Sequence, residues 1–240
     1  MEMSAYHPFQ SAEAKIEYLA YCDEKDKEWP VVSESRMVDT SYGQTFVKVS
    51  GPAGAPPLVL LPGMWTSSVT WGWVPIMVDL SECYRTYAVD NIYDYGRSVN
   101  SRTYEGPDDF ANWLDELFSA LGLGNSITLM GLSLGGWLTN LYTLRFPNRL
   151  DKIVVLAPAG TVLPVSLQFN IRAIPMLILP FPYFAKSYLY WLGDYGMQKD
   201  DASRMLVKRA VDHILMNRRC FKSKQPLFPT VFEDKELKSI

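Results

Sequence analysis

The segment Gly131-Leu132-Ser133-Leu134-Gly135-Gly136 carries the clearest chemical pattern in the chain. A serine in the pattern G-x-S-x-G is typical of a sharp turn between a strand and a helix, where its hydroxyl is exposed for reaction. The glycines are required because side chains beside the serine would collide in so tight a turn. Ser133 is therefore the predicted nucleophile, and attack of its hydroxyl on a carbonyl carbon is the predicted chemistry.

The residues around this motif favour the same interpretation. The apolar run Ile127-Thr-Leu-Met130 predicts a buried strand before it, and a helix is expected from about Leu134 to Arg145. A glycine-rich turn that contains a serine by chance is the alternative, and the strand before and helix after argue against it. The first turn of a helix offers N–H groups without partners, so the N–H of Leu134 is expected beside the developing oxyanion.

Apolar strands and amphipathic helices alternate through most of the chain. Segment 45–49 alternates in polarity, whereas three further runs are apolar at nearly every position, as strands buried on both faces are. A helix with one apolar face is predicted after Gly106-Pro107, and another around 71–80. The three buried runs are 58–61, 87–89 and 153–156, and the apolar positions after Pro107 are Phe110, Trp113, Leu114, Leu117, Phe118 and Leu121.

This alternation predicts an α/β fold with a mostly parallel sheet and helices on both faces. We expect four parts: an N-terminal helical extension over 1–40, a core over 41–160, a helical cap over 161–230 and a linker over 231–240. Ser11 can cap the helix expected over 11–28. The cap is inferred from the segment after Gly160, which is rich in aromatic residues and methionine and is interrupted by proline.

On these residues the chain, from about 40 to 240, resembles the capped serine hydrolases of the α/β-hydrolase family, and among them the carboxylesterases. Leu58-Val-Leu-Leu-Pro-Gly-Met-Trp65 is similar to the family's strand and oxyanion loop, with Pro62 where a histidine usually stands. Segment 90–98 resembles its D-x-x-G-x-G-x-S turn. The resemblance implies ester hydrolysis by acyl transfer, without cofactor or metal. It also implies that Met64, otherwise a core or rim residue, supplies the second oxyanion-binding N–H beside that of Leu134.

The C-terminal segment departs from the family pattern. In the family the catalytic acid and histidine follow the cap, each after a further strand. Here 232–240 resembles the linker to the first of those strands, so the chain is expected to be truncated before both. Its two histidines are His7, in the N-terminal tail, and His213, on a helix expected over 202–217. His213 is the candidate base, and a polar residue on a helix face is the alternative.

The function that the sequence favours is hydrolysis of small, apolar acyl esters. Trp65 and Trp137 are expected to line the substrate pocket, although each could be ordinary core. Two alternatives remain. The chain could be a truncated, inactive homologue that acts as a binding or interaction protein, or an incomplete product of a longer gene.

Composition excludes several other classes of protein. The chain has 240 residues, 48% hydrophobic and 20% charged, and a net charge of -3, so neither disorder nor nucleic-acid binding is expected. Its most apolar segment, 174–184, is too short to span a membrane. Cys22, Cys83 and Cys220 form no paired motif. Together with an N-terminus unlike a signal peptide, they favour a cytoplasmic protein.

The strand expected over 153–156 also predicts self-association. In the truncated fold it would lie at the edge of the sheet, yet it is apolar at every position. Natural edge strands are protected by charge, proline or bulges, because an unprotected edge pairs with another chain. A homo-oligomer joined at this edge is therefore expected, with a small ester as the other partner.

Overall fold

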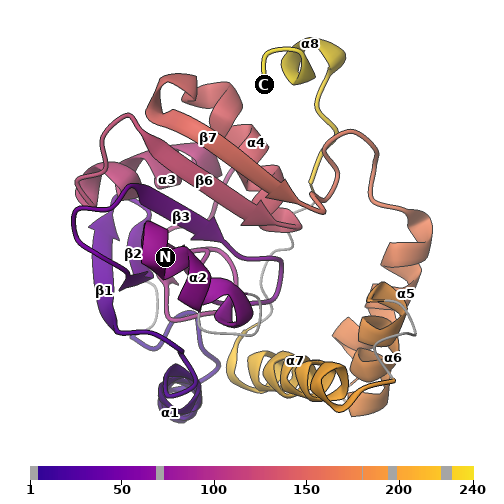
Figure 1. Ribbon diagram of the computed structural model, residues 1–240. Helices are drawn as coiled ribbons and strands as arrows, with labels where there is room; N and C mark the ends of the chain where they lie inside the picture. Colours follow the sequence, from indigo (N-terminus) through magenta and orange to yellow (C-terminus); the bar gives the residue numbers. More distant parts are fainter. Residues whose placement is uncertain (1–4, 69–72, 180, 194–198, 223–228) are drawn as a thin grey trace.

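The computed structural model describes residues 5–68, 73–179, 181–193, 199–222 and 229–240. Its centre is a seven-stranded sheet in the order β1-β2-β4-β3-β6-β7, with β5 beside β2 (Figure 1). Strands β4, β3, β6 and β7 are parallel, whereas β2 pairs antiparallel with its neighbours. The strands are β1 (Ser33–Thr40), β2 (Gly43–Ser50), β3 (Pro57–Leu61), β4 (Arg85–Val89), β5 (Val99–Asn100), β6 (Ile127–Leu132) and β7 (Leu150–Leu156).

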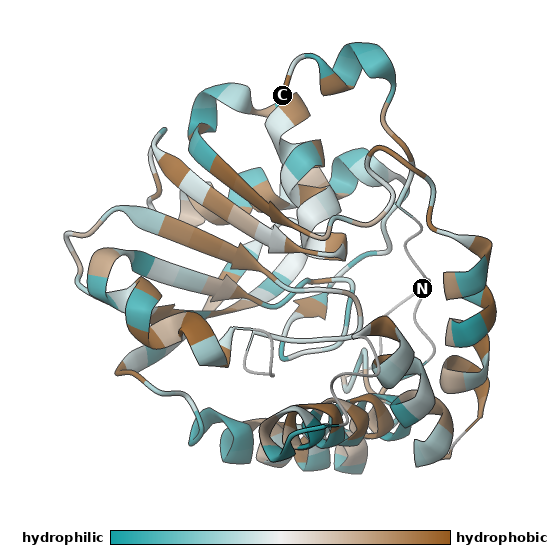
Figure 2. Ribbon diagram, turned by 45° about the vertical axis from the view of Figure 1, so that its right-hand side comes forward, coloured by the Kyte–Doolittle hydropathy of each residue, from teal (hydrophilic) through white to brown (hydrophobic). Residues whose placement is uncertain are grey.

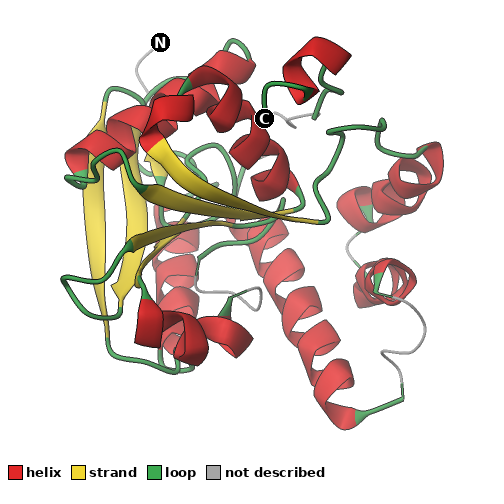
Figure 3. Ribbon diagram, turned by 45° about the horizontal axis from the view of Figure 1, so that its top comes forward, coloured by secondary structure: helices red, strands yellow, loops and turns green. Residues whose placement is uncertain are grey.

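Helices cover both faces of this sheet, as the sequence predicts (Figure 3). The 3-10 turn η1 (Val74–Ile76) and helix α2 (Met77–Cys83) lie on one face, and α3 (Pro107–Ala120) and α4 (Leu134–Arg145) pack on the other. The packing of strand β3 on both faces explains why its sequence is apolar throughout. Val59 and Leu61 pack towards α3 and α4, whereas Leu58 and Leu60 pack towards α2, because successive side chains of a strand alternate between faces.

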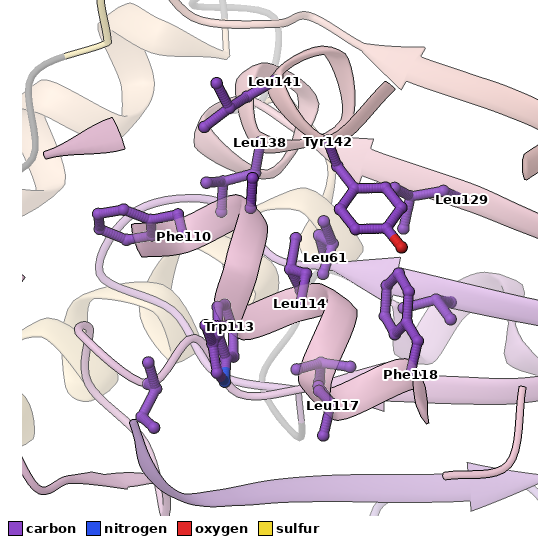
Figure 4. Close-up of a cluster of buried hydrophobic side chains, with 14 of the residues drawn as sticks. Leu61, Phe110, Trp113, Leu114, Leu117, Phe118, Leu129, Leu138, Leu141 and Tyr142 are labelled. Atoms are coloured by element: carbon purple, nitrogen blue, oxygen red, sulfur yellow. The ribbon is translucent and has the colours of Figure 1, made fainter. Parts of the chain in front are cut away.

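The larger core lies between the sheet and the pair α3 and α4 (Figure 4). Trp113 is fully buried there, and its indole N–H donates to Thr45 Oγ1 at 2.8 Å. The hydroxyl of Tyr142 donates to Asp115 at 2.9 Å. The buried indole N–H of Trp113 and the hydroxyl of Tyr142 are therefore both paired. This packing holds α4 against β6, and the turn between them carries the serine motif.

The N-terminal segment differs from the helical extension expected over 1–40. Helix α1 (Ala12–Asp26) is present, with Ser11 as its N-cap. Residues 33–40, however, form β1, which pairs with β2 along its whole length. The sequence of β1 is mostly polar because it is an edge strand with no fully buried residue. It therefore lacks the apolar alternation by which other strands are recognised.

Helix α1 connects the core to the cap. Arg97 pairs with Asp23 at 2.7 Å and with Asp26 at 2.8 Å, and Lys48 pairs with Asp26 at 2.8 Å. On its other side, Tyr18 packs against Phe221, next to the end of α7. Charge pairs therefore fasten α1 to the sheet, and aromatic packing fastens it to the cap.

Three helices after β7 form the cap: α5 (Leu167–Ile178), α6 (Pro182–Leu192) and α7 (Asp201–Cys220). They stand apart from the sheet, beside the carboxyl ends of its parallel strands (Figure 1). Hydrophobic and hydrophilic residues alternate along them, whereas the central strands of the sheet are mostly hydrophobic (Figure 2). Their shared cluster includes Ala173, Met176, Tyr188 and Val211.

In the described part of the chain, strand β7 lies at the edge of the sheet, as expected, although its apolar sequence is typical of a strand buried on both faces. Among the described residues it pairs with β6 alone, and Val154 and Leu156 are 39% and 36% exposed. Residues 231–240, expected as a linker, contain the short helix α8 (Asp234–Leu237). Phe232 donates its backbone N–H to Thr161 O at 3.1 Å, which holds this segment against the loop after β7.

Candidate functional site

Ser133 lies at the turn between β6 and α4, as predicted. Its backbone has φ 54° and ψ −111°, a conformation that residues other than glycine rarely adopt. Three hydrogen bonds fix it there. The Ser133 N–H donates to Leu156 O at 2.9 Å, and its carbonyl accepts from the N–H groups of Trp137 and Ala159, both at 3.1 Å. Strain of this kind persists only where the surroundings over-determine it and is concentrated at active sites.

The glycines of the motif are required by close backbone contacts. A Cβ atom on Gly131 would lie 2.1 Å from Gly135 O and 2.5 Å from Thr139 Oγ1. A Cβ on Gly135 would lie 2.2 Å from Leu61 O. These positions cannot carry a side chain without moving β3 or α4, which is the steric reason predicted for the motif.

A cavity of about 540 Å³ opens in front of Ser133, between the carboxyl edge of the sheet and the cap. Its volume is in the range of small-molecule sites. The walls come from the loop after β3, the loop after β7 and the three cap helices. The lining includes Pro62, Gly63, Met64, Trp65, Thr66, Ser67, Trp73, Leu132, Ser133, Ala157, Pro158, Gly160, Phe169, Tyr188, Trp191 and His213.

The loop after β3 is held beside Ser133 by two carboxylates. Asp94 accepts the Trp65 N–H at 2.8 Å, and Asp90 accepts the Ser68 N–H at 2.6 Å. Burial raises the pKa of Asp90, and the hydrogen bond from Ser68 opposes that rise. A Cβ on Gly63 would lie 3.6 Å from the Ser133 Cβ, so the loop packs directly against the nucleophile.

The role of Met64 and Leu134 as oxyanion-hole donors stays a prediction, and both residues lie beside the nucleophile. Met64 lines the cavity within this loop. Leu134 begins α4, where a backbone N–H has no acceptor inside the helix. The side chain of Leu134 packs in the core, so only its backbone could take part. Leu134 follows Ser133 directly in the sequence, and Met64 follows Gly63, which packs on Ser133.

The structure does not support His213 as the base that activates Ser133. Its side chain lines the cavity, but neither ring nitrogen has a hydrogen-bond partner among the described residues, Ser133 included. Burial, reinforced by the charge of Lys25, lowers the pKa of His213 from 6.5 to about 3. An imidazole with so low a pKa is a poor proton acceptor. His7 instead lies 3.2 Å from Asn100 Oδ1.

Of the two tryptophans predicted to line the pocket, only Trp65 does so. Trp137 is fully buried, donates its indole N–H to Thr230 O at 2.9 Å and stacks on Phe232. The prediction for Trp137 is wrong because helix α4 directs this residue into the layer between the sheet and the C-terminal segment. A further tryptophan between β3 and α2, Trp71, lies outside the described residues.

The loop after β7 is the part of the site that sequence reasoning missed. Ala157 has φ 42° and lines the cavity together with Pro158 and Gly160. A Cβ on Gly136 would lie 3.0 Å from Pro158 Cβ, so this loop packs on the serine motif. The Ala-Pro-Ala-Gly sequence marks the end of a strand, but nothing in it indicates a cavity wall.

In the described part of the chain, no helix is long and apolar enough to cross a membrane. No group of three or more His, Cys, Asp or Glu side chains there is arranged to hold a metal ion.

Comparison with known proteins agrees with the α/β fold. A family model for the alpha/beta hydrolase fold matches residues 56–223. The carboxylesterase nap of Bacillus subtilis is 36% identical over 227 residues, which are 93% of this chain and 72% of that protein. Carboxylesterase YbfK of the same organism is 35% identical over 235 residues, 97% of this chain and 76% of that protein.

Solved structures give the same result. The crystal structure of naproxen esterase (carboxylesterase NP) from Bacillus subtilis superposes with a TM-score of 0.82 at 34% identity, covering 96% of this chain and 78% of that one. A hydrolase of 2-hydroxy-6-oxo-6-phenylhexa-2,4-dienoate from Rhodococcus has a TM-score of 0.64 at 18% identity, covering 78% of this chain and 72% of that one. The second likeness shows the fold alone.

Proposed function

The chain belongs to the α/β hydrolase family, and on that premise we propose that it hydrolyses carboxylic esters by acyl transfer through Ser133. The observation that carries this proposal is the strained backbone of Ser133 at the wall of a mostly apolar cavity. Two relatives with 35–36% identity over nearly the whole chain are carboxylesterases, which supports the same reaction class. Three free thiols, Cys22, Cys83 and Cys220, are in keeping with a cytoplasmic location, which we also propose.

The proposed reaction has two steps. The Ser133 oxygen attacks the ester carbonyl carbon, the bond from that carbon to the alcohol oxygen breaks, and the alcohol leaves with a proton. Water then attacks the acyl-serine, which releases the carboxylic acid and restores the Ser133 hydroxyl. In both steps the N–H groups of Met64 and Leu134 stabilise the negative oxygen of the tetrahedral intermediate.

The rate of the first step depends on a base, and within the described residues no histidine is hydrogen-bonded to Ser133. Loss of the histidine from a serine hydrolase lowers turnover by about a millionfold, and an oxyanion hole with binding alone leaves ~10³–10⁴ over water. We therefore propose slow turnover by this 240-residue chain. Small activated esters should be preferred over long-chain lipids, because a weak nucleophile needs a good leaving group.

A binding protein built on the same scaffold is the second candidate. The observation that favours it is the lack of a hydrogen-bonded base at Ser133 in the described residues. Such a protein would hold a ligand in the cavity without turnover. The two functions therefore differ in one measurable property, which is catalysis that depends on Ser133.

Hydrolysis of p-nitrophenyl butyrate separates them. The esterase proposal predicts slow release of nitrophenol that falls to the buffer rate in Ser133→Ala. Ser67→Ala is the matched control, because Ser67 is a second serine of the cavity wall and should be dispensable for acyl transfer. A rate equal to buffer in the unmodified chain, or one that persists in Ser133→Ala, would favour the binding protein.

A further inference from the structure

The cap wall of the cavity holds a polar side chain that has no hydrogen-bond partner among the described residues. His213 is 1% exposed, lines the cavity and has no hydrogen-bond partner for Nδ1 or Nε2 in the ranges that the structure describes. Trp73, on the sheet side of the same cavity, is also 1% exposed, and its indole N–H has no partner in those ranges. Buried polar groups are nearly always hydrogen-bonded, so two exceptions in one cavity require an explanation.

The ring of His213 is held in place by packing against α1. Tyr21 stacks on it with centroids 5.9 Å apart and planes at 27°, and the ring of Tyr18 lies at 6.5 Å. Aromatic contacts of this kind use the face of the imidazole and leave its edge nitrogens free to bond. The ring is therefore fixed in orientation before any ligand arrives, which lowers the entropy lost on binding.

The charge state of His213 limits what it can bind. Its pKa of about 3 results from burial first and from Lys25 second, and the other titratable groups beside it are Tyr18 and Tyr21. At neutral pH the imidazole is therefore neutral and offers one donor and one acceptor. In an apolar cavity such a group suits a neutral polar partner, since a charged one would be buried without compensation.

We propose that His213 is a specificity-determining residue that hydrogen-bonds a neutral polar group of the substrate, such as a hydroxyl. The indole N–H of Trp73 is a second donor in the same cavity. This inference rests on the proposed function for the identity of the site, and it names a substrate class: esters that carry a hydroxyl away from the ester bond. A hydrocarbon ester of the same shape would leave both groups unsatisfied.

The test compares methyl 4-hydroxyphenylacetate with methyl phenylacetate, which differ by one hydroxyl. Binding of both to the Ser133→Ala chain is measured by titration calorimetry, so that no turnover is needed. We expect the hydroxy ester to bind about tenfold more tightly, the usual value of one buried hydrogen bond. In Ser133→Ala/His213→Phe the ratio should fall to about one. In Ser133→Ala/Asp212→Asn, altered at an exposed neighbour on α7, it should stay about tenfold.

NMR of the Ser133→Ala chain supplies a readout that a merely structural histidine would not give. The chain has two histidines, so the ring signals of His213 are assigned by comparison with His213→Leu, which also replaces the phenylalanine variant if that one does not fold. The hydroxy ester should shift the His213 signals far more than methyl phenylacetate does.

Several results would overturn the inference: equal binding of the two esters, binding of neither, a preference that survives removal of the imidazole, or equal shifts of the His213 signals. Failure of the proposed function looks different. In that case the unmodified chain hydrolyses no ester, while the tenfold preference in Ser133→Ala remains. Conversely, Ser133-dependent hydrolysis with equal binding of both esters rejects the role of His213 alone.

Discussion

The two walls of the cavity are built in opposite ways. On the sheet wall, the backbone N–H and carbonyl of Ser133 are both hydrogen-bonded, and the glycines beside it leave no room for a side chain. On the cap wall, His213 is fixed by ring packing while its two nitrogens have no partner among the described residues. This difference indicates that the two walls have different roles. The sheet wall sets the geometry of the reacting group, and the cap wall has hydrogen-bonding capacity left for the ligand.

A substitution at Gly135 should disrupt the tight packing of the sheet wall. Gly135→Ala should destabilise the fold by about 3 kcal/mol or prevent folding, because its Cβ would lie 2.2 Å from Leu61 O and both backbones are held in place. Gly124→Ala is the matched control, since no atom lies within 4 Å of its Cβ, and its effect should be below about 1 kcal/mol. Urea unfolding measures both. Equal stability of the two variants would contradict a tightly packed sheet wall.

The cap wall should make the protein sensitive to acid. His213 has a pKa of about 3 in the folded chain against 6.5 ordinarily, so the unfolded chain binds the extra proton between those values. Above pH 6.5 the imidazole is neutral in both states and the free energy of unfolding does not depend on its titration. As pH falls from 6.5 towards 3, the free energy of unfolding decreases, because only the unfolded chain takes up the proton. Between pH 7 and pH 4 the unmodified chain should lose about 3 kcal/mol more than His213→Phe. Parallel pH profiles of the two proteins would refute the buried, neutral state.

The loop after β3 depends on Asp94 for its position beside Ser133. Asp94→Ala removes the acceptor of the Trp65 N–H, next to Met64, so the oxyanion-binding amide should lose its fixed position. We expect kcat for p-nitrophenyl butyrate to fall about tenfold with little change in KM, which corresponds to about 1.4 kcal/mol in the transition state. A change confined to KM would show that the loop binds substrate without positioning the amide.

The smallest effect on folding is expected at β7. Val154→Lys, at a 39% exposed position, should change the free energy of unfolding by less than about 0.5 kcal/mol. It should nevertheless abolish self-association, because a charge on an edge strand opposes pairing with a second chain. Light scattering after size exclusion compares the two proteins. A monomeric unmodified chain at micromolar concentration would reject the proposed oligomer.

The sequence predicts the sheet wall far better than the cap wall. The glycines around Ser133, the strand before it and the helix after it are local patterns with one steric solution, and the structure confirms them. Strand β1 was missed because its polar edge sequence shows no apolar alternation. The error at Trp137 has a different origin, since the direction of a side chain from a helix depends on which layer covers it.

The state of His213 could not be predicted from the sequence at all. Its burial depends on Tyr18 and Tyr21, which lie nearly two hundred residues earlier in the chain and reach it only because α1 packs on α7. The helix pattern of α7 shows a polar residue at 213 but not its depth. Non-local packing of this kind sets pKa values and cavity walls, whereas the serine motif is set by neighbours in sequence.

The central claim, that Ser133 is the nucleophile of this fold, is tested most directly by covalent labelling with a fluorophosphonate probe and mass spectrometry of the labelled peptide. We predict slow labelling at Ser133 and none in Ser133→Ala, with Ser67→Ala labelled like the unmodified chain. Labelling is expected to be slow because no base is hydrogen-bonded to Ser133 among the described residues. Label on another serine, or labelling unchanged in Ser133→Ala, would contradict it.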